Sequence, residues 1–197
     1  MTDKRFRKLI AFLKEIEKLK LVERRVKVSS RKRFENTAEH SWDLAMWVWV
    51  LFNDFRPKPN LLKTIKLVLM HDLVEIYAGD TFFFDRVGHK SKNHREEKAA
   101  KKLFAKLPPD LKKEFEKLWR EFEEGKTRES KIARSVDKLQ PMLQNIISGG
   151  YSWEKHKITE ADIHKYKLDY MVHDKAILKV YQKLIKSAKQ LKLISVH

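Results

Sequence analysis

Residues 67–80 read LVLMHDLVEIYAGD, an apolar run of helical character that contains His71, Asp72 and Glu75. These residue types are rarely buried without a partner, so their place in an apolar run requires a physical cause. On a helical wheel at about 100° per residue, all three side chains fall within one arc of an otherwise apolar face. Lys66 falls on the opposite side, where a solvated face is expected. We therefore expect the three polar groups to converge within a buried face.

A counter-charge is required at this face, because a buried carboxylate without a partner costs several kcal/mol and two neighbouring carboxylates repel one another. One divalent cation would meet the need, and so would a buried Arg or Lys. This stretch alone leaves both interpretations open. The chain contains no cysteine, which excludes disulfides and thiolate ligands, so any metal must be held by His, Asp or Glu.

Two more polar side chains lie in otherwise apolar helical segments. His40 follows Asn36, which has Glu39 three residues on, the capping-box pattern that begins a helix. Asp137 lies within the apolar pattern IARSVDKLQPML. Each alone has a structural interpretation, a helix-start contact for the histidine and an ion pair one turn earlier for the aspartate. Together with the histidine and aspartate of the opening stretch, they make four candidate metal ligands.

The His-Asp dipeptide is weak evidence by itself, because a second copy occurs at His173-Asp174. This second pair follows Met171 and Val172 in a segment otherwise rich in Lys and Tyr. No capped, histidine-bearing helix is placed to join it. We interpret His173 as a packed or surface histidine.

Helical periodicity dominates the chain, which has five Gly, five Pro and no Asn-Gly or Asp-Gly hairpin signal. We expect an all-α fold that forms one domain over residues 1–197. The expected helices cover residues 3–22, 36–55, 60–77, 91 or 93 to 106, 110–124, 127–148 with a bend or interruption at Pro141, and 159–191. An irregular connection is expected over residues 81–93.

The composition limits the class of protein. With 197 residues, 42% of them hydrophobic, the chain is long and apolar enough to fold. No apolar stretch approaches the roughly 20 residues of a membrane span, and the first residues, MTDKRFRKLI, lack the apolar centre of a signal peptide. We expect a cytoplasmic protein with no membrane partner. The formal net charge of +17 favours anionic partners, although a Lys-rich solvated surface explains it equally well.

Several stretches resemble the HD-domain superfamily of metal-dependent phosphohydrolases, in its 5'-deoxynucleotidase-like branch. These are RFENTAEHSWDLA at 33–45, MHDLVEIYAGDT at 70–81, REEKAAKKLFAKLP at 95–108 and ARSVDKLQPMLQN at 133–145. The resemblance covers about residues 20–185. It implies a helical bundle with one metal site in its core, and a nucleotidase that releases phosphate from (deoxy)nucleoside 5'-monophosphates. It also implies a homodimer, to which WDLAMWVWVLF could contribute an apolar interface, although the same Trp-rich run would serve equally well as core.

The resemblance implies that one divalent ion is held by His40, His71, Asp72 and Asp137. Such a mixed nitrogen and oxygen site suits Mn, Co, Ni, Fe or Zn and also accepts Mg. Those four ligands would place the ion against the phosphate of a small anionic phosphoester or nucleotide. No specific nucleic acid is expected as a partner.

The resemblance also implies roles for three further residues. Glu75 matches a catalytic glutamate, for acid-base work or orientation of the attacking water, with a hydrogen bond to a ligand histidine as the alternative. Asp80 matches a position near the nucleotide, with a loop cap as the alternative. Arg33 is a candidate phosphate contact, with a solvated charge as the alternative.

One departure from the family pattern leaves the sugar preference open. The family's Arg-Trp pair before the first histidine, which helps to select deoxyribose, is replaced here by ERRVKV, with Arg24 and Arg25 but no Trp. A pyrophospho- or triphosphohydrolase of the same fold is one alternative function. A basic nucleic-acid-binding protein with a vestigial metal site is an alternative of another class.

Overall fold

The computed structural model describes residues 1–81 and 86–195, with side chains described throughout except at 86–89. The α-helices are α1 (Asp3–Ile16), α2 (Thr37–Leu51), α3 (Leu61–Met70), α4 (Glu75–Ala78), α5 (Arg86–Phe104), α6 (Pro109–Glu124), α7 (Arg128–Ile147), α8 (Tyr151–Lys155), α9 (Glu160–Lys167) and α10 (Lys175–Gln190). Short 3₁₀ turns follow α1, α3 and α9, at Glu17–Leu21, His71–Val74 and Leu168–Tyr170. The strands are β1 (Glu23–Lys27) and β2 (Phe34–Asn36). The fold is therefore helical, as predicted.

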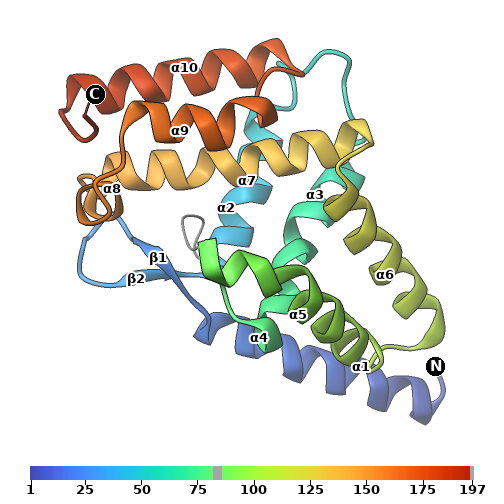
Figure 1. Ribbon diagram of the computed structural model, residues 1–197. Helices are drawn as coiled ribbons and strands as arrows, with labels where there is room; N and C mark the ends of the chain where they lie inside the picture. The colour runs from blue at the N-terminus through green and yellow to red at the C-terminus, as the bar shows by residue number, and fades with distance from the viewer. Residues whose placement is uncertain (82–85, 196–197) are drawn as a thin grey trace.

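Helix α7 is the central element of the bundle, since it packs against α2, α3, α6 and α10 (Figure 1). In this view α9 and α10 lie above it, whereas α1 runs along the lower edge and α5 lies in front. Among the described residues, every helix is too short or too polar to span a bilayer.

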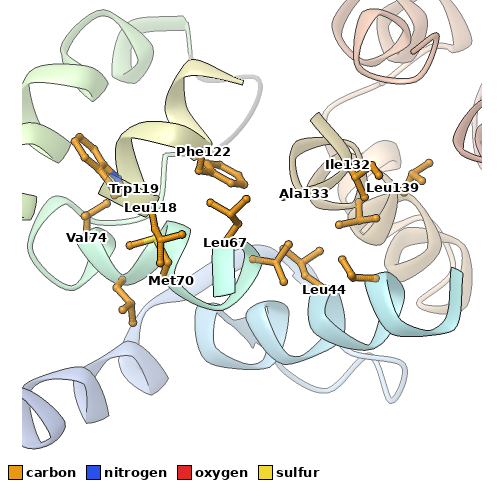
Figure 2. Packing of buried hydrophobic residues seen from close by; sticks show 14 of the residues in the cluster. Leu44, Leu67, Met70, Val74, Leu118, Trp119, Phe122, Ile132, Ala133 and Leu139 are labelled. Carbon is orange, nitrogen blue, oxygen red and sulfur yellow. The ribbon is translucent and has the colours of Figure 1, made fainter. Parts of the chain in front are cut away.

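The hydrophobic core lies between α2, α3, α6 and α7. Figure 2 shows Leu44, Leu67, Phe122 and Ile132 from these four helices pointing toward one another. Leu44, Leu67 and Ile132 have no exposed surface, and Phe122 has 6%. Burial of such side chains contributes about 1.5–3 kcal/mol each, so this core fixes the helices that carry the polar site described below.

The β1–β2 hairpin was not predicted. The two strands are antiparallel, with Glu23 opposite Asn36 and Lys27 opposite Phe34, and the ladder has an irregularity between the two pairs. The strands are short and their connection lacks a two-residue turn, which is why no hairpin signal was found. Arg31 takes up the left-handed conformation in that connection, at φ 59°. Asn36 also caps α2, with the predicted capping box to Glu39.

The predicted continuous helix over 60–77 was wrong, because its α-helical geometry stops at Met70. Residues His71–Val74 form a 3₁₀ turn, and α4 follows before Gly79 at φ 74°. The Nδ1 atom of His71 lies 2.8 Å from the carbonyl oxygen of Val68, so the ring uses a helical carbonyl of its own segment. The break therefore falls at the His-Asp pair itself.

The predicted last helix over 159–191 is two helices. After α9 and its 3₁₀ turn, Asp174 begins α10 by accepting hydrogen bonds from the backbone amides of Ala176 and Ile177. Asp174 also pairs with Arg128 of α7. The second His-Asp pair is thus a helix cap tied to a neighbouring helix. The short helix α8 after Gly150 was not predicted either.

Helix α5 begins at Arg86, earlier than the predicted start at 91 or 93. The first part of the expected irregular connection, residues 82–85, lies outside the described residues. Helix α7 continues through Pro141 without interruption. Because proline has no N–H, the carbonyl of Asp137 one turn earlier lacks its helical donor.

Candidate metal centre and its cavity

The structure brings the four predicted metal ligands together from α2, α7 and the 3₁₀ turn after α3. His40 Nε2 lies 3.1 Å from Asp137 Oδ1 and 3.9 Å from Asp72 Oδ2. His71 Nε2 lies 3.0 Å from Asp72 Oδ2 and 3.9 Å from Asp137 Oδ1. The same four atoms thus face one point from three segments.

Both histidines are oriented by acceptors on their other ring nitrogen. His40 Nδ1 donates to Gln140 Oε1 at 2.9 Å, and His71 Nδ1 donates to the Val68 carbonyl at 2.8 Å. Gln140 can only accept through that oxygen, because its Nε2 donates to Glu35 at 2.6 Å and to Asp43 at 2.9 Å. Each ring therefore turns Nε2 toward the two carboxylates, as second-sphere partners do for metal-binding histidines.

The donor set fits a divalent ion. His71 Nε2 is buried and makes no hydrogen bond to the described residues. His40, His71 and Asp72 each offer an atom within 4.8 Å of the others, and the Oδ1 atom of Asp137 lies beside both rings. Two imidazoles and two carboxylates make the mixed set that transition-metal ions prefer.

The electrostatics of the site are those of two ionised carboxylates. Burial alone would raise the pKa of Asp137, but Lys138 and the two histidines hold it well below its ordinary value. Burial opposes protonation of His71, yet Asp72 and Asp137 raise its pKa to about 10. Burial and the charge of Arg24 lower the pKa of His40 to about 4. A proton and a metal ion therefore compete for Nε2 of His71.

Arg24 of β1 supplies a second counter-charge to the carboxylates. Its guanidinium lies 3.1 Å from Glu35, 3.4 Å from Asp72 and 3.9 Å from Asp80. The side chain of Arg24 is only 13% exposed. An arginine was one of the two counter-charges that the sequence left open. Arg24 lies beside the candidate ligands, and Asp72 faces both this arginine and the two histidines.

Glu75 is buried beside this cluster. Its Oε2 atom lies 3.1 Å from the hydroxyl of Thr37, which begins α2. Burial raises the pKa of Glu75 well above its ordinary value, and the charges of Asp72 and Asp80 add to the effect. Burial likewise raises the pKa of Asp80 against the opposing charge of Arg24. The surroundings therefore favour the protonated form of both carboxyls, which suits groups that exchange a proton with a substrate or water.

Arg33 does not reach the cluster. It is exposed and makes a bidentate pair with Glu39, at 2.8 and 2.6 Å, and a further bond to the Phe34 carbonyl. The structure therefore places it on the outside of the α2 capping box. His173 is half-buried and hydrogen-bonds to Ser135 at 2.7 Å, in agreement with its interpretation as a packed histidine.

The cluster opens into a cavity of about 330 Å³. His71, Asp72, Glu75, Asp80 and Asp137 line it on the ligand side. The basic residues of its wall are Arg24, Arg25, Lys92, Arg134, Lys138 and Lys167, and its aromatic residues are Phe122, Trp153 and Tyr170. Glu96 and Glu123 also line it, so the cavity has six basic and six acidic side chains, and a bound divalent ion would tip this balance in favour of an anion.

Several residues of the site were missed from the sequence. Gln140 carried a signal, because it lies three positions after Asp137 and so shares its helix face. Thr37 lies three positions before His40 and shared its face in the same way. Lys167 and Glu35 carried no such signal, since their roles depend on how distant segments pack.

Known proteins are similar to this chain in sequence over most of its length. The family pattern described as HD domain matches residues 16–176. The protein 5'-deoxynucleotidase HDDC2 of Homo sapiens is 32% identical over 139 residues, which cover 70% of this chain and 67% of the human protein. The Saccharomyces cerevisiae 5'-deoxynucleotidase YBR242W is 26% identical over 141 residues, which cover 69% of this chain and 58% of the yeast protein. The matched part thus spans about two thirds or less of these relatives.

Solved structures share the fold. The predicted metal-dependent phosphohydrolase from Magnetospirillum magnetotacticum is 33% identical and superposes with a TM-score of 0.91, over 98% of this chain and 97% of that chain. The PH0347 protein from Pyrococcus horikoshii is 23% identical, with a TM-score of 0.62 over 92% of this chain and 99% of that chain. The second likeness concerns the fold alone.

Proposed function

The chain belongs to the HD-domain family, and we propose that it is a metal-dependent phosphohydrolase that releases phosphate from nucleoside 5'-monophosphates. The observation that supports this most directly is the convergence of His40, His71, Asp72 and Asp137 at the edge of a cavity, where the Nε2 atom of each histidine lies 3.0–3.9 Å from an oxygen of both aspartates. Relatives named 5'-deoxynucleotidase support the substrate class.

We assign those four side chains to one divalent ion, with Mn, Co, Ni, Fe, Zn and Mg as candidates. Held there, the ion would supply Lewis-acid stabilisation of charge on the phosphoryl oxygens. The protein's own residues then divide the remaining tasks between binding, orientation and proton transfer.

Glu75 and Asp80 are the proton-handling groups in this proposal. Glu75 orients the attacking water and takes its proton as the water oxygen bonds to phosphorus. The bond from phosphorus to the 5' oxygen breaks, and Asp80 delivers the proton that the leaving oxygen needs. Raised pKa values of both carboxyls support these roles, and Arg24 keeps Asp80 beside the ligand cluster at 3.9 Å.

The test uses two histidines of the same chain. Purified protein is incubated with Mn, Co or Mg and a panel of ribo- and deoxyribonucleotides, and the released product is identified. We expect inorganic phosphate from monophosphates in the wild type, loss of turnover in His71→Ala, and retention in His173→Ala, the matched change in the second His-Asp pair. Release of pyrophosphate or triphosphate would favour the alternative hydrolases. If no phosphoester is hydrolysed by the wild type, the proposal fails.

We also propose that two copies associate through the outer face of α2 and α3. Trp42, Trp49, Val50 and Leu62 on this face are 62–70% exposed. Residues 34–55 contain no Lys or Arg although the chain has 44 of them, so α2 adds no cation to this face. An apolar face to which α2 contributes no basic residue is where two strongly cationic copies can meet with little repulsion.

A further inference from the structure

Lys167 is the one lysine among the buried residues of the described chain, although the sequence has 44 basic residues. It is 6% exposed and ends α9, and it lines the cavity beside the metal ligands. Burying an ammonium is costly, and lysines are among the residues that interiors contain least. A single buried lysine at the wall of a cavity therefore points to a use for its charge.

The position of Lys167 is fixed by α7. Its Nζ donates to the carbonyl oxygen of Lys138 at 2.8 Å. Lys138 follows the candidate ligand Asp137, and its own Nζ lies 2.7 Å from Asp137 Oδ2, the oxygen that does not face the histidines. Lys167 is thus held one residue from the metal ligand of α7.

The charge around Lys167 favours an incoming anion. Burial lowers its pKa to about 7, and the charges of Lys138 and Arg24 add to that effect while Asp137 opposes it. Burial and the neighbouring charges together therefore disfavour the charged form of the Lys167 ammonium. A phosphate dianion in the cavity would reverse this effect and stabilise the charged form.

We propose that Lys167 is a phosphate-binding residue that contacts a phosphoryl oxygen of the substrate from α9. This inference rests on the proposed function. Lys167 lines the same cavity as His71, Asp72 and Asp137, and its Nζ is positioned by the Lys138 carbonyl. In this subsite the ion held by the four candidate ligands would face the phosphoryl group on one side, and the lysine would contact it from α9. The alternative is a structural lysine that only joins α9 to α7.

The experiment measures inorganic phosphate binding to the Mn-loaded protein by calorimetry, alongside thermal unfolding and Mn affinity. Lys167→Met keeps the length of the side chain and removes the ammonium. Lys165→Met changes an exposed lysine of the same helix and is the matched control. Lys167→Arg retains the charge. We expect Lys167→Met to weaken phosphate binding about tenfold or more, as for one lost charge-assisted hydrogen bond, with unchanged Mn affinity and no loss of thermal stability.

The outcomes separate the inference from the function on which it rests. If the wild type does not bind phosphate, both are overturned. If the wild type binds phosphate and Lys167→Met binds it equally, the inference alone is overturned, and a fall in thermal stability would then identify a structural lysine. Should Lys167→Met fail to fold, Lys167→Gln and Lys167→Arg decide, since only the arginine variant is expected to keep phosphate binding near that of Lys165→Met.

Discussion

The Nε2 atom of His40 lies 3.1 Å from Oδ1 of Asp137, although 97 positions of sequence separate the two residues. The contact joins α2 to α7 at the point where the 3₁₀ turn after α3 adds His71 and Asp72. Two imidazoles and two carboxylates at one point are poorly stable without a shared cation, because the carboxylates repel one another. Residues that orient or surround this cluster should therefore affect metal affinity, stability and activity in different ways.

Gln140 is expected to control metal affinity without touching the metal. Gln140→Met removes the acceptor for His40 Nδ1, so the ring loses its fixed orientation. We expect Mn affinity to fall about 10–100-fold, the range found when second-sphere partners of metal ligands are removed. Gln144→Met is the control, because this buried glutamine one turn later donates to the Lys27 carbonyl instead. Equal Mn affinity of the two variants, measured by calorimetry, would refute the role of Gln140.

Asp174 is expected to be structural, in contrast with Asp72 of the first His-Asp pair. Asp174→Asn should lower the free energy of unfolding by about 2–4 kcal/mol, because it removes the charge of a buried pair with Arg128 while the asparagine oxygen can still cap the helix. Phosphate release by the folded variant should equal that of the wild type. Urea unfolding and a turnover assay check both expectations, and a variant of full stability but no activity would contradict them.

The same pair sets a pH dependence of stability. Burial acts to raise the pKa of Asp174, but Arg128 and the backbone amide of Ile177 outweigh it and lower the pKa below its ordinary value. Its contribution to stability is therefore present above the unfolded pKa of about 3.9 and is lost as the pH falls through the folded value. The difference between wild type and Asp174→Asn should shrink in acid.

Arg33 is expected to matter little for catalysis, contrary to the interpretation of the sequence. It is exposed and its guanidinium is occupied by Glu39 outside the cavity. Arg33→Ala should change kcat/KM by less than about twofold and cost at most about 1 kcal/mol of stability, as is usual for an exposed ion pair. Arg24→Ala is the comparison, since Arg24 lies beside Asp72 and Asp80. A large loss of activity in Arg33→Ala alone would restore the sequence-based role.

The fold was predictable where one physical signal dominated. The 3.6-residue period and the Asn36 capping box located most helices. The stretches that resemble the family assigned the four candidate ligands to one ion. The signals failed where tertiary contacts decide. The break at His71 depends on its bond to Val68, and the break before α10 depends on the pairing of Asp174 with Arg128.

The site showed the same division. Gln140 could have been found from its helical spacing to Asp137. Arg33 lies apart from the cluster, and composition does not show that Glu39 occupies its guanidinium. Lys167 is one lysine among many in the sequence, and only packing of α9 against α7 makes it the buried one.

The exposed face of α2 and α3 is expected to form the contact between two copies. Trp49→Asp places a charge on this face, where Trp49 is 63% exposed, and should shift the protein from dimer to monomer in analytical ultracentrifugation. Trp42→Asp should act in the same direction. Val172→Asp is the control, because Val172 is similarly exposed, at 60%, but belongs to the segment before α10 and not to α2 or α3. A wild type that is monomeric at all concentrations would contradict the dimer.

The most direct test of the central claim is a titration of metal-free protein with Mn, followed by phosphate release from a deoxynucleoside monophosphate. We expect turnover to rise from zero and to saturate at one bound ion per chain, and we expect Asp137→Ala neither to bind the ion tightly nor to hydrolyse the substrate. Full turnover in the presence of a chelator, or in Asp137→Ala, would contradict the assignment of these four residues to a catalytic metal.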